Sequence, residues 1–68
     1  MSLKQMRIHK KLTQIQVARE FGVSQVTISQ WENGESYPHP SRIAKLANIY
    51  SVTEGEIIAA ITATKSSA

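Results

Sequence analysis

Residues 14–33 read QIQVAREFGVSQVTISQWEN, and this stretch predicts two short helices joined by a tight turn. Thr13 precedes the first helix and Ser24 precedes the second, each as a residue type that caps helix N-termini. Gly22 lies between the two helices and can take the positive φ that a sharp reversal of the chain requires. Gly34 follows Asn33 and marks the end of the second helix.

The second helix of this pair has two different faces. At roughly 100° per residue, Ile28 and Trp31 point in the same direction and form a face that is buried. The opposite face carries amides, hydroxyls and a single valine instead of the usual mixture of lysine and glutamate. Amides and hydroxyls can read base edges in DNA, and a valine suits the methyl group of thymine. A polar surface helix with one exposed apolar residue would show the same pattern.

The stretch resembles the helix-turn-helix of the phage Cro and repressor family. Counting from Gln14, it has an alanine, a turn glycine and two buried apolar residues where that family places them, at Ala18, Gly22, Ile28 and Trp31. The resemblance runs from Arg7 to Ile58 without a gap and includes the ENG tripeptide at 32–34, Pro38 and the IAKLA run at 43–47. It implies an all-α fold, a five-helix Cro/repressor-like helix-turn-helix domain that binds DNA.

The resemblance also implies which side chains contact which part of the DNA. It places base contacts on the outward face of the second helix, at Gln25, Val26, Ser29 and Gln30, with Thr27 reaching base or backbone. It places phosphate contacts at Gln14 and Asn33, with Lys10, Lys11 and Thr13 as further candidates. A homodimer, formed at least on DNA, would bind a palindromic operator and repress transcription by blocking polymerase, in a phage or mobile element.

An arginine lies on the apolar stripe of a first helix, which we expect at roughly Ser2 to Lys10. Arg7 therefore needs a carboxylate partner, and Glu32 points partly toward the buried face of its own helix. We predict an ion pair between Arg7 and Glu32, and the family places a similar pair there. Two unrelated surface charges are the alternative interpretation.

Two further helices follow the loop after Gly34. The fourth begins at Pro40, with His39 or Ser41 as its cap, and Thr53 with Glu56 forms a capping box for the fifth. Their apolar residues are Ile43, Leu46, Ala47 and Tyr50 in the fourth helix and Ile57, Ile58 and Ile61 in the fifth. We assign residues 1–61 to one domain and residues 62–68 to a flexible tail. Ser51 stands where relatives usually end the fourth helix with glycine.

The net charge of +3 is confined to one half of the chain. Residues 1–34 hold five Lys or Arg side chains against two glutamates, whereas residues 35–68 hold three of each sign. A basic surplus beside a candidate reading helix is what a nucleic-acid-binding domain requires, although ordinary solubilising lysines would give the same surplus. The chain has no cysteine, no apolar run long enough for a membrane and no secretory signal. We expect it in the cytoplasm of a bacterial host cell, at the nucleoid.

Other functions compete with DNA binding. A protein-interaction module, such as an antitoxin or an anti-repressor partner, could use the same fold, and its binding would not weaken steeply with salt. An enzyme is the least favoured class, because five glutamates without aspartate or cysteine, and two separated histidines, offer no paired acid and base. Neither histidine has a partner at metal-ligand spacing. We expect no cofactor, metal or small-molecule ligand.

Overall fold

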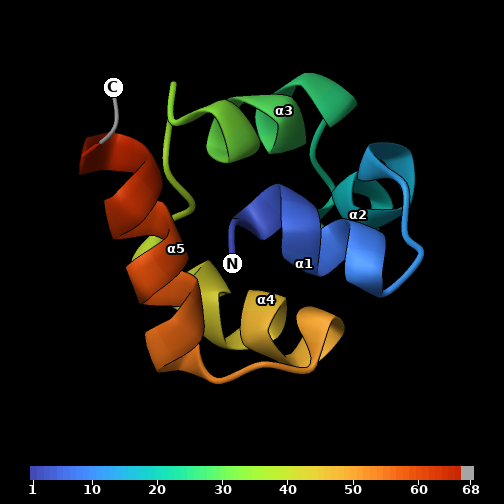
Figure 1. Ribbon diagram of the computed structural model, residues 1–68. Coiled ribbons are helices and arrows are strands. Elements are labelled where there is room, and N and C mark those ends of the chain that lie inside the picture. Colours follow the sequence, from blue (N-terminus) through green and yellow to red (C-terminus); the bar gives the residue numbers. More distant parts are fainter. Residues whose placement is uncertain (67–68) are drawn as a thin grey trace.

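The computed structural model describes residues 1–66, and the regular secondary structure of these residues is entirely helical. Five α-helices and one 3-10 helix follow one another along the chain (Figure 1). They are α1 (Leu3–His9), α2 (Gln14–Phe21), α3 (Gln25–Asn33), η1 (Pro40–Arg42), α4 (Ile43–Tyr50) and α5 (Glu54–Ser66). The predicted all-α class with five helices is confirmed.

Local signals in the sequence set the ends of α2 and α3. The Thr13 hydroxyl accepts the N–H of Gln16, and the Gln16 side chain accepts the N–H of Thr13, which completes a capping box at the start of α2. Gly22 ends α2 with φ of 64°, in the left-handed region that favours glycine. The Ser24 hydroxyl then caps α3 by accepting the N–H of Thr27. Gly22 and Ser24 therefore encode the turn between the two helices.

The core is apolar and draws on all five α-helices. Ala18 is 3% exposed, and its short side chain lets α2 and α3 approach each other closely. Isoleucine and tryptophan on the inner face of α3 are buried, as the helical periodicity predicts. The buried hydrophobic residues of the core are Leu3, Met6, Val17, Ala18, Ile28, Trp31, Leu46, Ala47, Tyr50, Ile57 and Ala60.

An aromatic pair with two cations ties η1 and α4 to the helix pair α2 and α3. The rings of Phe21 and Trp31 meet edge to face, with centroids 5.5 Å apart and an interplanar angle of 82°. The Arg42 guanidinium lies 6.0 Å from each ring centroid, and the Lys45 ammonium lies 5.1 Å from that of Phe21. Lys45 also donates to the Glu20 carbonyl near the end of α2. Because these contacts involve Trp31 on the inner face of α3, they help to fix the orientation of that helix.

The fourth helix begins differently from the prediction. Pro40 opens the short 3-10 helix η1, and regular α-helix starts only at Ile43. His39 is the cap, because its Nδ1 accepts the N–H of Ser41 at 3.1 Å. Ser51 ends α4 with φ of 56°, so a serine occupies the left-handed position that glycine would fill without strain.

The last helix extends past the predicted domain boundary at residue 61. α5 runs to Ser66, so residues 62–66 continue the helix. The sequence predicts a flexible tail from Thr62 instead. Residues 67–68 of that predicted tail lie outside the described residues. Figure 1 shows α5 rising from the end of α4 to the segment that follows α3. A Cβ placed on Gly34 would lie 2.8 Å from Cγ2 of Thr64, which shows how closely α5 approaches the end of α3. No helix among the described residues has the length and apolar character to cross a membrane.

Candidate nucleic-acid interface

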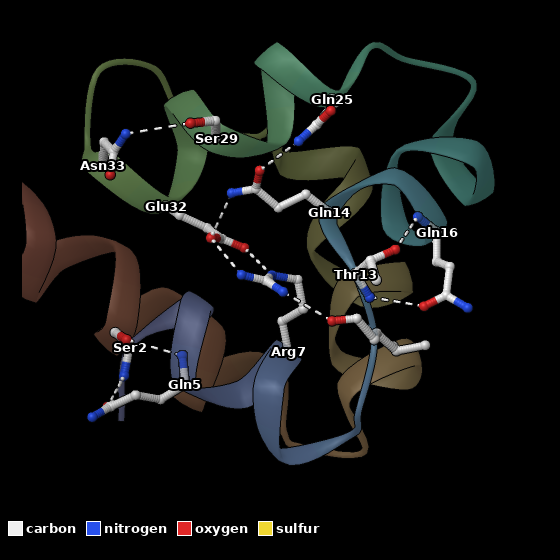
Figure 2. A network of polar contacts seen from close by, with 11 residues as sticks. Ser2, Gln5, Arg7, Thr13, Gln14, Gln16, Gln25, Ser29, Glu32 and Asn33 are labelled. Atoms are coloured by element: carbon white, nitrogen blue, oxygen red, sulfur yellow. Dashed lines mark hydrogen bonds and ion pairs between the residues drawn. The ribbon is translucent and has the colours of Figure 1, made fainter.

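The structure contains the ion pair predicted between α1 and α3. Arg7 Nε donates to Glu32 Oε2 at 2.6 Å and Arg7 Nη2 donates to Glu32 Oε1 at 3.3 Å (Figure 2). A third donor, Arg7 Nη1, reaches the Leu12 carbonyl at 2.9 Å. The side chains are 11% and 3% exposed, so both charges are largely removed from water. The hydrogen bond to Glu32 raises the pKa of Arg7 above its ordinary value.

The Glu32 carboxylate also orients a chain of two amides. Its Oε1 accepts from Gln14 Nε2 at 3.0 Å, and Gln14 Oε1 in turn accepts from Gln25 Nε2 at 3.2 Å. A carboxylate can only accept, so the NH₂ group of Gln14 must face Glu32 and its oxygen must face Gln25. One N–H of Gln25 is thereby used, and one N–H and the carbonyl oxygen are left for a ligand. Figure 2 shows Gln14 lying between Glu32 and Gln25.

The outward face of α3 lies beside this amide chain. Gln25 is exposed and Val26 has 63% of its surface accessible, whereas Thr27, Ser29 and Gln30 are half-buried. The Thr27 hydroxyl lies 3.3 Å from that of Ser24, at the cap of the helix. All the side chains predicted for base contacts thus belong to a single short helix that presents Gln25 and Val26 to solvent.

The residues predicted for phosphate contacts lie at the start of α2 and the end of α3. Asn33 is exposed, and its Nδ2 donates to Ser29 Oγ at 3.4 Å, so it lies against the reading face. Thr13 accepts at its hydroxyl oxygen within the capping box, which leaves its hydroxyl proton to donate. Lys10 and Lys11 are exposed in the turn before α2, where Lys11 has φ of 59°. Gln14 donates one N–H of its side-chain amide to Glu32, so the second N–H is left to donate to a phosphate.

Comparison with known proteins identifies the family of the chain. The sequence model of the Helix-turn-helix family matches residues 3–57. The chain belongs to that family. It is also 39% identical, over 56 residues, to the HTH-type transcriptional activator BcrR of Enterococcus faecalis. That match covers 82% of this chain but only 28% of BcrR. No solved structure matches the chain.

The helix-turn-helix proper consists of α2, the turn at Gly22 and α3, and its family assignment was predicted from the sequence. The contact between Gln14 and Gln25 was not predicted. The available signal was the glutamine at the first position of each helix, separated by 11 residues. Because those positions meet only when α2 and α3 pack, helical periodicity alone does not show that one amide sets the direction of the other.

Proposed function

We propose that this helix-turn-helix domain binds double-stranded DNA sequence-specifically through α3 and thereby regulates transcription. The observation that carries the proposal is the amide chain that starts at buried Glu32 and ends at exposed Gln25. A solvated surface glutamine has no need of a buried carboxylate to orient its amide, whereas a base-reading glutamine gains affinity and specificity from being held before it binds. BcrR is named as a transcriptional activator, which agrees with a regulatory function.

The direction of the amide chain favours adenine at the position that Gln25 reads. Adenine presents N7 as an acceptor and N6 as a donor, which matches the one N–H and the oxygen that Gln25 has left. Guanine presents two acceptors, N7 and O6, so Gln25 would need both of its N–H groups and would have to release Gln14. We therefore propose an adenine opposite Gln25 in each half of the site.

Phosphate contacts on either side of α3 would hold the domain in the position on DNA that brings Gln25 to its adenine. The second N–H of Gln14, the Thr13 hydroxyl and the exposed ammonium groups of Lys10 and Lys11 can hold one phosphate group, together with the N–H groups of the first turn of α2. Asn33 would hold another at the far end of the reading helix. The basic surplus of residues 1–34 favours binding to a polyanion such as DNA.

We further propose that two copies bind a palindromic operator as a homodimer, in the cytoplasm of a bacterial cell. Occupation of the operator would repress transcription where the site overlaps the promoter, because the bound protein excludes polymerase. The name of BcrR shows that a relative of this domain serves in an activator. The position of the operator relative to the promoter would then decide whether binding represses or activates transcription.

Selection of bound sites from random duplex DNA tests the proposal. The Gln25→Ala and Gln30→Ala variants should each lose about 1 to 3 kcal/mol of binding to the selected site while their melting temperatures stay near that of the wild type. Binding to unrelated DNA should change little, because phosphate contacts dominate it. Loss of stability with unchanged operator affinity would show that these side chains do not face DNA. Capture of a protein partner that does not weaken with salt would favour the interaction module instead.

A further inference from the structure

Val26 is an apolar side chain that the core does not use. Of the three large apolar residues on α3, Ile28 and Trp31 are 1% and 5% exposed, whereas Val26 is 63% exposed. It lies in the first turn of the helix, directly after Gln25. If the proposed function holds, this side chain meets the bases in the major groove, where a valine can contact methyl groups but cannot hydrogen-bond.

Gln30 lies one turn after Val26, on the same side of the helix. Its side-chain amide makes no hydrogen bond within the described residues, in contrast to the amide of Gln25, which is held by Gln14. The Gln30 amide can therefore turn by half a revolution without losing a partner. It can present either its N–H₂ group or its oxygen to a base edge, as the base requires.

These two side chains match a property that thymine shares with one modified base. Thymine and 5-methylcytosine both carry a methyl group at C5, which projects into the major groove. They differ at position 4, where thymine has an accepting oxygen and 5-methylcytosine has a donating amino group. We propose that Val26 and Gln30 together read a C5-methylated pyrimidine of either kind, so that methylation of an operator cytosine strengthens binding. This inference rests on the proposed function of α3.

The expected effect is small but well defined. Burying one methyl group against an apolar side chain changes the binding constant by about four-fold at each contact. A dimer that makes the contact in both halves of an operator would respond by on the order of 15-fold. The effect should be the same for the two bases, because Val26 contacts only the methyl group and the free amide of Gln30 adjusts to position 4.

The test is a set of four duplexes at each pyrimidine of the selected half-site, carrying uracil, thymine, cytosine or 5-methylcytosine. Affinities are compared only within one base pair, thymine against uracil and 5-methylcytosine against cytosine, so that the opposing purine is unchanged. At one position, the wild type should prefer each methylated base by about four-fold. Val26→Ala should lose both preferences at an unchanged melting temperature. Gln30→Ala should bind all four duplexes more weakly and keep both preferences.

Ile15→Ala is the matched control, because Ile15 is also an exposed aliphatic residue, at 48%, but belongs to α2. It should keep both methyl preferences. The inference is overturned if no position shows both preferences, if thymine is preferred to uracil while 5-methylcytosine and cytosine bind equally, or if Val26→Ala retains the two effects. In each of these cases the protein still selects a DNA sequence, so the proposed function stands. If no duplex sequence is selected at all, the proposed function and this inference both fail.

Discussion

The ion pair between Arg7 and Glu32 offers the sharpest test of how α1 supports the reading helix. Removing either side chain leaves a charge in a largely buried place without its main partner. The two single losses should differ. Glu32, at 3% exposed, would keep only the N–H of Gln14, whereas Arg7, at 11% exposed, would keep the Leu12 carbonyl and more contact with water. Arg7→Ala should therefore destabilise the domain more than Glu32→Ala.

The size of the effect follows from the burial of the pair. Breaking a buried ion pair by removing one partner costs about 3 to 5 kcal/mol. A domain of 68 residues has a total unfolding free energy of about 3 to 10 kcal/mol, so either variant should lose a large part of its stability. A loss of about 3 kcal/mol corresponds to a fall in melting temperature of roughly 12 to 24 °C at this size. The double variant leaves no charge unpaired, and we expect a coupling energy of about 1 to 3 kcal/mol.

Urea denaturation of the wild type, the two single variants and the double variant would measure this coupling as a double-mutant cycle. Lys4→Ala is the control, because Lys4 is an exposed cation on the same helix as Arg7 and should change stability little. A coupling energy near zero, or a control that loses as much stability as Arg7→Ala, would refute the argument that the pair itself ties α1 to α3.

Three further predictions concern backbone positions and one buried phenol. Gly34→Ala should destabilise more than Gly22→Ala, as measured by thermal unfolding. Both glycines have positive φ, but only a new Cβ at Gly34 would meet Thr64. Thr64→Ser should therefore recover part of the difference in stability, and equal losses for the two glycine variants would contradict the proposed clash. Ser51→Gly should raise the unfolding free energy by about 1 kcal/mol, because it relieves a left-handed serine, and an unchanged or lower value would count against strain there. Burial, with a further contribution from Glu32, raises the pKa of Tyr50 to about 12 from 10.0. The neutral phenol therefore contributes stability below pH 10 that is lost as the pH rises toward 12, and Tyr50→Phe should flatten that part of the stability profile if this is correct.

Features that depend on a few neighbouring residues could be predicted from the sequence. The caps at Thr13 and Ser24 and the left-handed turn at Gly22 are chemical properties of those residues, and the structure shows each in place. The two faces of α3 follow from helical periodicity, which fixes the direction of Ile28 and Val26 relative to each other. Arg7 and Glu32 could be paired across 25 residues because a charge on an apolar stripe requires a partner.

Tertiary packing alone decided how the candidate site is held and where the fold ends. The direction of the Gln25 amide depends on Glu32 through Gln14, a relation that exists only because α2 and α3 pack against each other. The small, polar composition of residues 62–68 is typical of a frayed end, yet α5 continues to Ser66 and packs against the end of α3 at Gly34. Composition describes what a segment can do alone, whereas a contact between Thr64 and Gly34 depends on the shape of the whole core.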